Sequence, residues 1–112
     1  SAGPHHSGMY HPIWAHIPGL IVCVPSNPAD AKGLLLAALE DPDPVIIFEH
    51  KLLYKMKAQV PEGYYTTPIG KAQIMRPGRD VTIVASAIMV HRALEAAVRS
   101  GLAAARRVAD AR

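Results

Sequence analysis

Cysteine, aromatic side chains and long apolar runs are all scarce in this sequence. Cys23 is the single cysteine among 112 residues, so the chain cannot form an internal disulfide. Its apolar neighbours indicate a small buried side chain, and we expect a reducing compartment. No apolar run reaches the roughly 18 residues that a membrane helix needs, and no signal peptide opens the chain. The sequence therefore predicts a soluble, intracellular protein with no membrane partner.

Basic charge is too thinly spread to predict a nucleic-acid partner. The formal net charge is +3, and part of it comes from four arginines near the end of the chain, Arg99, Arg106, Arg107 and Arg112. These arginines form no basic stripe interleaved with aromatic side chains. Hydrophobic residues make up 50% and charged residues 19% of the chain, which is the composition of a folded globular protein.

The first half of the chain has the pattern of a strand, a helix and a second strand. Residues 19–25 and 44–50 are short apolar runs bounded by Gly or Pro, as expected for parallel strands buried on both faces. Between them, residues 28–41 predict a helix that Asn27 caps and Pro28 begins. That helix is apolar nearly all round, so we expect it to be covered on two sides.

The second half begins with an irregular stretch and then returns to the α/β pattern. Residues 51–68 carry two prolines and a glycine without a sustained period, which is typical of a linker. Two strands are expected around the turn RPGRD, with residues 81–85 as the stronger one. A helix over residues 88–100 follows, and Glu95 precedes Arg99 by the four residues that suit an exposed ion pair.

Three motifs resemble a known family when they are taken together. The motifs "PS-x-P-x-DAKGLL", "DPDPVI-x-F-E-x-K-x-LY" and "G-x-DVTIV" are similar to those of the beta subunit of the thiamine-diphosphate-dependent first component of 2-oxoacid dehydrogenase complexes, a group that includes pyruvate, branched-chain 2-oxoacid and acetoin dehydrogenases. The resemblance implies an α/β fold in which residues 1–55 end a transketolase-like pyrimidine-binding domain, a parallel sheet with flanking helices. Residues 56–77 would be a linker, and residues 78–112 would start a transketolase C-terminal-type α/β domain.

The resemblance also implies an activity, cofactors and partners. The activity is oxidative decarboxylation of a 2-oxoacid, or cleavage of acetoin, with acyl transfer to lipoamide. The cofactor is thiamine diphosphate with Mg²⁺, bound mainly by residues and a subunit outside this chain. The implied partners are an alpha subunit, a second beta subunit and a lipoyl-bearing dihydrolipoamide acyltransferase. The expected location is the cytoplasm of a bacterium or the mitochondrial matrix of a eukaryote.

The opening segment GPHHSGMYHPIWAH contains four of the six histidines. The pair His6 and Ser7 stands where the family places a His-Ser pair in an active-site loop. The resemblance implies that this histidine stabilises the thiamine-bound intermediate and assists acyl transfer, work that suits a side chain with a pKa near neutrality. A solvated loop histidine is the alternative. We expect His16 to support packing or chemistry, and His5 and His11 to lie on the surface.

Two features of the sequence bear on metal binding, the spaced histidines and the end of the first predicted helix. His6, His11 and His16 are spaced by five residues, which would scatter them round a helix, and no Cys-x-x-Cys or His-Glu-x-x-His motif accompanies them. A transition-metal site is therefore disfavoured, as is a purification tag. The resemblance implies instead that a monovalent cation such as K⁺ is held by Ala38, Asp41 and Asp43, and an ordinary capped turn is the alternative.

Other residues are expected to have structural roles. Glu49, Lys51 and Tyr54 match the family segment that follows the second strand, where we expect structure and subunit contacts. His91 and the four methionines, Met9, Met56, Met75 and Met89, are assigned to packing or to the surface.

The chain also departs from the family pattern. Gly8 stands where a glutamine is usual, and Pro12 interrupts the helix that normally follows, which predicts a displaced loop. The glutamate that activates thiamine and the Gly-Asp-Gly motif for Mg²⁺ are both absent, so we expect the isolated chain to be inactive. The alternatives are a truncated domain that binds an alpha-like partner or dimerises, and a relative of transketolase or deoxyxylulose-phosphate synthase.

Overall fold

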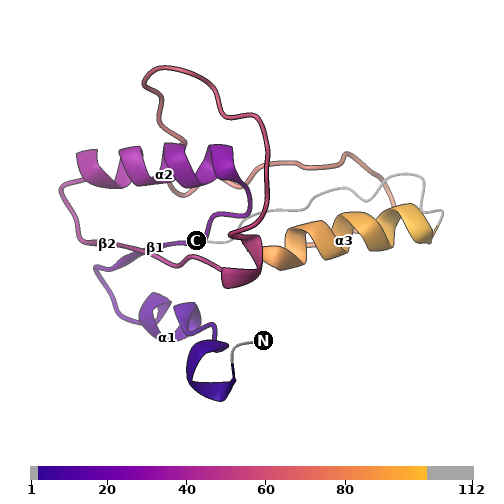
Figure 1. Cartoon of the computed structure of the whole chain (residues 1–112), viewed down its shortest axis with the longest axis horizontal. Helices are drawn as coiled ribbons and strands as arrows, with labels where there is room; N and C mark the ends of the chain where they lie inside the picture. The colour runs from indigo at the N-terminus through magenta and orange to yellow at the C-terminus, as the bar shows by residue number, and fades with distance from the viewer. Residues whose placement is uncertain (1–2, 101–112) are drawn as a thin grey trace.

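A computed structural model describes residues 3–100 of the chain. Its first half is a βαβ unit, in which β1 (Ile21–Cys23) and β2 (Val45–Ile47) flank α2 (Pro28–Glu40) in sequence. The two strands pair in parallel, with Val22 opposite Ile46 at the centre of the register. Figure 1 shows α2 on one side of this sheet and α1 (His11–Ala15) on the other. The predicted parallel α/β architecture is confirmed.

Local signals explain where α2 begins and ends. Asn27 has extended backbone, and its side chain accepts a hydrogen bond from the amide of Asp30 at 2.8 Å. Pro28 occupies the first turn, where a helix needs no N–H group. The helix ends at Glu40 with Asp41 as its cap, because Pro42 follows. The predicted helix over residues 28–41 is therefore correct to within one residue.

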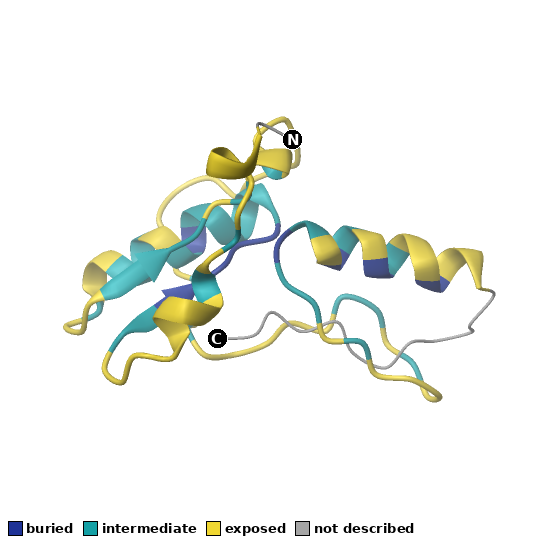
Figure 2. Ribbon diagram, turned by 90° about the horizontal axis from the view of Figure 1, so that it is seen from below, coloured by how far each residue is buried: buried dark blue, intermediate teal, exposed yellow. Residues whose placement is uncertain are grey.

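The predicted burial of the βαβ unit is only partly correct. Val22 and Cys23 are buried, but all three residues of β2 are half-buried. In α2, Leu35 and Leu39 are 51% and 75% exposed, so the expectation that this helix is covered on two sides is wrong. The reason is that the described sheet has only two strands, and the irregular chain of residues 61–67 contacts only part of the remaining helix surface. Figure 2 shows α2 as mostly half-buried, with exposed positions at its C-terminal end.

The second half of the chain contains one long helix, α3 (Ile88–Arg99). Its predicted bounds are correct to within one residue, but Glu95 pairs with Arg92 at 3.1 Å and not with Arg99 as predicted. Val90 and Ala93 are buried on its inner face, where Met75, Ile83 and Leu94 pack against them. The start of α3 is strained, because Ala87 has a φ of 50°, a region that favours glycine.

The predicted strand over residues 81–85 is wrong. Within residues 3–100, Val81 alone forms a β-bridge, and residues 82–85 have no regular structure. Strand-forming side chains make a strand only where a second strand accepts the ladder of hydrogen bonds. Residues 51–68 are irregular chain apart from the short 3-10 helix η2 (Lys51–Leu53), and their role as a linker between two domains stays a prediction. The prediction that residues 101–112 continue a C-terminal domain lies outside the described residues.

A small core joins the two halves of the described chain. Val22 in β1 and Val24 just after it pack with Ala87, and half-buried residues that include Met9 and Phe48 lie against this cluster. Every helix in residues 3–100 is too short or too polar to cross a membrane.

Candidate functional site

The short 3-10 helix η1 (Pro4–His6) presents the predicted catalytic histidine. The turn is closed at its base, where the Ser7 hydroxyl donates to the carbonyl of Gly3 at 2.7 Å. Gly3 has a φ of 80°, which allows the chain to enter this turn without strain. His5, His6 and Ser7 are all exposed. The local fold therefore turns the imidazole of His6 outward, where a substrate or another chain can reach it.

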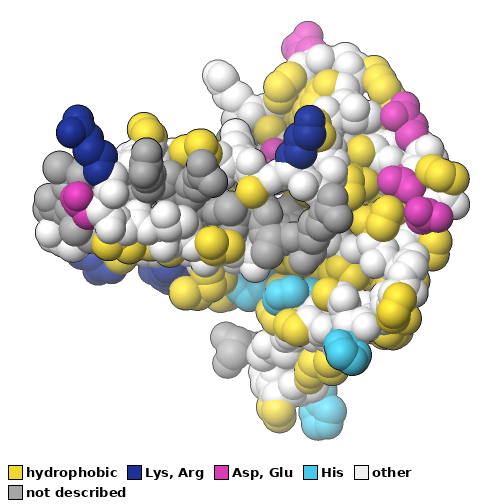
Figure 3. Space-filling view, turned by 180° about the vertical axis from the view of Figure 1, so that it is seen from behind, with side chains coloured by type: hydrophobic (Ala, Val, Ile, Leu, Met, Phe, Trp, Pro, Cys, Tyr) yellow, Lys and Arg dark blue, Asp and Glu magenta, His cyan; other side chains and the backbone are white. Residues whose placement is uncertain are grey.

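The segment after His6 differs from the prediction in two ways. Pro12 does not interrupt a helix there, because it lies in the first turn of α1, where its missing N–H costs nothing. His11 is not a surface residue, because it is half-buried with its ring edge-to-face against Phe48, 6.1 Å between centroids. His16 is exposed at the end of α1. The histidines therefore do not form a single cluster, although Figure 3 shows several of them at the same end of the molecule.

In residues 3–100, no three His, Cys, Asp or Glu side chains lie close enough together to hold a metal ion. The predicted cation residues have a different arrangement. The amide of Asp43 donates to Oδ1 of Asp41 at 3.0 Å, and the Asp41 amide donates to the carbonyl of Ala37 at 3.1 Å. This is the geometry of a capped turn.

The end of α2 nevertheless leaves oxygen atoms without helix donors. Residue 42, four positions after Ala38, is a proline, so Ala38 has no N–H partner in the next turn. The carbonyl of Glu40 also lacks an N–H donor in the next turn, because residue 44 is a proline. Carbonyl and carboxylate oxygens at a helix C-terminus are suitable ligands for a hard cation.

Polar side chains also meet where the two parallel strands end. A cavity of about 100 Å³ is lined there by Asn27, Pro28, Glu49, His50, Tyr54 and neighbouring apolar residues. The Tyr54 hydroxyl donates to Oε2 of Glu49 at 3.0 Å, and this bond, with the carboxylate charge, raises the pKa of the Tyr54 phenol. Lys51 lies in η2, between Glu49 and Tyr54 in the sequence. The edge where parallel strands end is the usual position of ligands in α/β folds.

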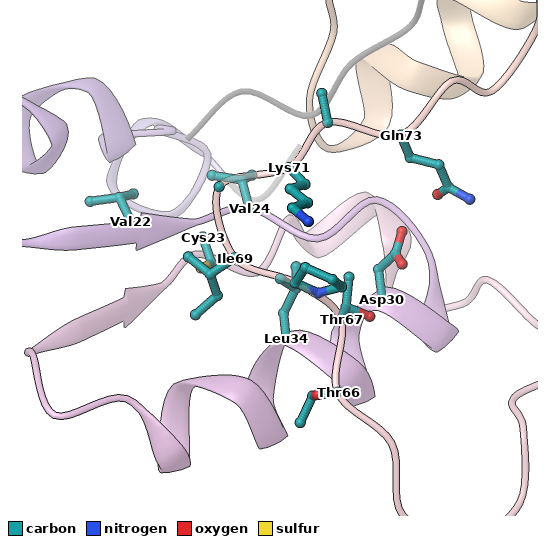
Figure 4. Close-up of a pocket in the computed structure, with 13 residues that line it drawn as sticks. Val22, Cys23, Val24, Asp30, Leu34, Thr66, Thr67, Ile69, Lys71 and Gln73 are labelled. Atoms are coloured by element: carbon teal, nitrogen blue, oxygen red, sulfur yellow. The ribbon is translucent and has the colours of Figure 1, made fainter.

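A larger cavity was not predicted from the sequence. It has a volume of about 380 Å³ and lies between β1, α2 and residues 66–73 of the irregular segment. Figure 4 shows side chains from these three parts of the chain around it, among them Cys23, Asp30 and Lys71. One wall is formed by residues 66–73, and no sequence pattern indicates that this segment returns to β1. His6 is not among the lining residues.

The structure also gives His91 a specific role that sequence reasoning missed. Nε2 of His91, on α3, donates to the carbonyl of Ser26, in the loop after β1, at 2.7 Å. Ser26 itself is 1% exposed. The contact ties α3 to the loop between β1 and α2, 65 residues away in sequence. A lone histidine on a helix carries no local signal of such a distant acceptor.

Comparison with known families identifies both halves of the chain. Residues 1–57 match the family described as "Transketolase, pyrimidine binding domain". Residues 70–112 match the family described as "Transketolase, C-terminal domain". The order of the two matches agrees with the predicted fold class.

Several curated proteins similar to this chain are beta subunits of dehydrogenases or oxidoreductases. The chain is 56% identical over 96 residues to the acetoin:2,6-dichlorophenolindophenol oxidoreductase subunit beta of Cupriavidus necator, covering 86% of this chain and 28% of that protein. It is 48% identical over 103 residues to the 2-oxoisovalerate dehydrogenase subunit beta of Bacillus subtilis, covering 87% of this chain and 32% of the relative. With the pyruvate dehydrogenase E1 component subunit beta-2, mitochondrial, of Oryza sativa, the identity is 50% over 99 residues, or 85% of this chain and 26% of the relative. The chain thus spans about three tenths of the length of these relatives, and it belongs to the transketolase-like family as a relative of the beta subunits of acetoin and 2-oxoacid dehydrogenases.

Proposed function

We propose that this chain is part of the beta subunit of a thiamine-diphosphate-dependent dehydrogenase. The enzyme cleaves acetoin or decarboxylates a 2-oxoacid and passes the acyl group to lipoamide. The observation that carries the proposal is the 56% identity to an acetoin oxidoreductase beta subunit, because the identity to the 2-oxoacid dehydrogenase relatives is 48% to 52%. Acetoin is therefore the first substrate to test.

The proposed partners follow from the names of the relatives. A subunit called beta implies an alpha subunit, and we propose a second beta subunit and a lipoyl-bearing dihydrolipoamide acyltransferase as further partners. We place the enzyme in the cytoplasm of a bacterium or in the mitochondrial matrix of a eukaryote. This proposal is supported by the sources of the relatives, which include bacteria and a rice protein named as mitochondrial.

We assign the residues that bind Mg²⁺ and the diphosphate to the partner subunit and to chain beyond this segment. Within residues 3–100 no cluster of three acidic or histidine ligands exists, and the loop from β1 to α2 reads Val24, Pro25, Ser26 and Asn27, without a glycine-rich phosphate loop. Those residues do not fit a diphosphate site, so the isolated 112-residue chain is expected to show no turnover.

His6 is the residue of this chain that we propose to act in catalysis. Its imidazole is exposed at the tip of a turn that the Ser7 hydroxyl closes against Gly3. A neutral imidazole nitrogen accepts a proton, and an imidazolium donates one, at little cost near neutral pH. His6 would thus hold or release a proton beside the reacting carbon, while Ser7 fixes the backbone that carries it.

We also propose that K⁺ binds at the end of α2. Ala38 would contribute its carbonyl, which has no helical donor because residue 42 is a proline, and the second carboxylate oxygen of Asp41 would add negative charge. Asp43 closes the turn through its amide. A rise in the melting temperature of the protein in KCl relative to NaCl of equal ionic strength supports this site, provided that Asp41→Asn abolishes it. Equal melting temperatures in the two salts contradict it.

The decisive experiment uses the full-length subunit purified with its alpha partner. Reduction of 2,6-dichlorophenolindophenol is measured with acetoin, pyruvate and 2-oxoisovalerate in separate reactions, because these substrates appear in the names of the relatives. His6→Ala should lower kcat by roughly 100-fold or more, the usual effect of losing a general acid or base. His5→Ala, the neighbouring exposed histidine, is the matched control and should change kcat little.

Two results would contradict these assignments separately. An absence of turnover with all three substrates contradicts the function of the whole protein. Equal activities of the His5 and His6 variants contradict the role of His6 and leave the function standing.

A second candidate is a non-catalytic domain that binds an alpha-like partner or a second copy of itself. The observation in its favour is the number of exposed apolar side chains, among which Ile13, Leu39 and Val98 are 63%, 75% and 71% exposed. Large exposed apolar patches are typical of interaction surfaces. Purification of the native protein distinguishes the two: a 112-residue native chain that co-purifies with a partner without turnover favours the second candidate.

A further inference from the structure

Lys32 makes an unusual set of contacts for a lysine on a helix surface. Its Nζ donates to the carbonyl of Pro61 at 2.9 Å and to the carbonyl of Gly63 at 2.8 Å. The same ammonium group lies 4.8 Å from the centre of the Tyr65 ring. Two carbonyl acceptors and one aromatic face therefore satisfy the charge of Lys32. All three belong to the segment that follows η2, about 30 positions away in sequence.

The same segment is fastened to α2 at further points. The Tyr65 hydroxyl donates to the carbonyl of Ala29 at 2.8 Å, and the amide of Thr67 donates to the carbonyl of Gly33 at 3.0 Å. The hydroxyl of Tyr64 donates to the carboxylate of Glu40. Residues 61–67, which we call the strap, thus contact α2 at points from its first turn to its last residue. Figure 1 shows the chain after η2 arching over α2.

The strap leads directly into the larger cavity. Its last residues, Thr66 and Thr67, line the 380 Å³ cavity together with residues 68–73. The opposite wall includes Cys23 of β1, which is 6% exposed. Whatever holds the strap on α2 therefore also holds one wall of this cavity over the thiol.

We propose that Lys32 is a positioning residue that locks the strap onto α2, closes the cavity over Cys23 and fixes the path from the βαβ unit toward α3. This inference is independent of the proposed function, because it concerns how the chain holds its own connecting segment. Lys32 is the strongest candidate for the lock because it makes two charge-assisted hydrogen bonds, whereas Tyr64 makes one, to the Glu40 carboxylate, and the bonds from Tyr65 and Thr67 join neutral groups. Once the ammonium is removed, the carbonyls of Pro61 and Gly63 lose their donor and can turn to water.

The single cysteine makes this proposal directly measurable. The rate of alkylation of Cys23 by iodoacetamide is compared in the 112-residue chain, in Lys32→Met, in Lys32→Arg and in Lys57→Met. Methionine keeps the length of the side chain without its charge. Arginine restores donors to both carbonyls and stacks on an aromatic ring. Lys57 is exposed and lies outside the strap, so its variant is the matched control.

We expect Lys32→Met to react roughly fivefold faster or more, because a local opening exposes the thiol without global unfolding. Lys32→Arg should react at about the rate of the parent chain, and so should Lys57→Met. An alkylation rate for Lys32→Met within about twofold of the parent overturns the proposal. Equal acceleration by Lys57→Met overturns it as well.

Amide hydrogen exchange separates release of the strap from general loss of stability. The amide of Thr67 reports the strap, and the amide of Phe48, which donates to the carbonyl of Cys23 at 2.9 Å, reports the sheet. Faster exchange at Thr67 alone in Lys32→Met supports the proposal. Equal acceleration of both amides shows that the sheet has been weakened as a whole, and this overturns it.

Discussion

Replacing Gly33 by alanine tests how closely the chain after β2 approaches α2. Gly33 is the buried residue of this helix, and a Cβ there would overlap Oγ1 of Thr67 and lie 2.9 Å from Cε2 of Tyr65. Thr67 has little room to withdraw, because its amide is bonded to the carbonyl of Gly33 at 3.0 Å. Its branched side chain also has few alternative rotamers.

Two opposing effects set the size of the change. Alanine in a helix interior is favoured over glycine by about 1 kcal/mol. Forcing an extra methyl group into a close contact costs about 1 to 3 kcal/mol. We expect the overlap to outweigh the helix preference, so that Gly33→Ala lowers the free energy of unfolding by about 1 kcal/mol. In a Thr67→Ala background the overlap with Oγ1 is absent and the close approach to the Tyr65 ring remains, so the same change should cost about 1 kcal/mol less than in the parent chain.

Urea unfolding of the parent, the two single variants and the double variant, followed by circular dichroism, provides the four values. The difference between the effects of Gly33→Ala in the two backgrounds measures the contact itself. If Gly33→Ala stabilises the protein equally in both backgrounds, Thr67 does not press against α2 and the described path of the chain is wrong.

Three further perturbations test separate local features. Asn27→Ala should lower the free energy of unfolding by about 1 kcal/mol in thermal denaturation, since the Asn27 side chain accepts the amide of Asp30, whereas Asn27→Ser, which keeps a capping oxygen, should lower it less. The hydrogen bond from Tyr54 to Glu49 raises the pKa of the phenol, so the bond is present at neutral pH and is lost as the pH rises through that raised pKa; Glu49→Gln should lower the pKa in an ultraviolet titration. Burial raises the pKa of the Cys23 thiol, so alkylation at mildly alkaline pH should be slower in the folded chain than in urea, and equal rates would contradict the burial.

The parts of the fold that were predicted correctly depend on short-range chemistry. A capping asparagine, a proline in the first turn and a proline after the last turn locate α2 without any knowledge of the rest of the chain. The parallel pairing of β1 and β2 follows from their short apolar runs on either side of one helix. Such signals act within a few residues, so they can be recognised in the sequence without knowing which distant segments pack nearby.

The errors depend on partners that are distant in sequence. Residues 81–85 have the composition of a strand, but a strand exists only where another strand pairs with it. His11 contacts Phe48, and His91 reaches the carbonyl of Ser26, although neither histidine differs from a solvated one in its local sequence. The cavity between β1 and residues 66–73 belongs to the same class of error. The role of His6 stays a prediction for a related reason, because its exposed ring requires groups beyond residues 3–100 to form a site.

The motif that carried much of the resemblance acquires a structural explanation. In the stretch "PADAKGLL", Pro28 begins α2, Asp30 closes the cap with Asn27, Lys32 binds two carbonyls of the strap, and Gly33 admits Thr67. Each of these residues acts in starting the helix or in holding the segment that leads toward α3. The motif residues that resemble the family therefore have structural roles in this chain. The chemistry that we propose rests on a different stretch, the exposed turn at His6. A variant of Lys32 should therefore alter the accessibility of Cys23, whereas a variant of His6 should leave that accessibility unchanged and alter turnover in the assembled enzyme.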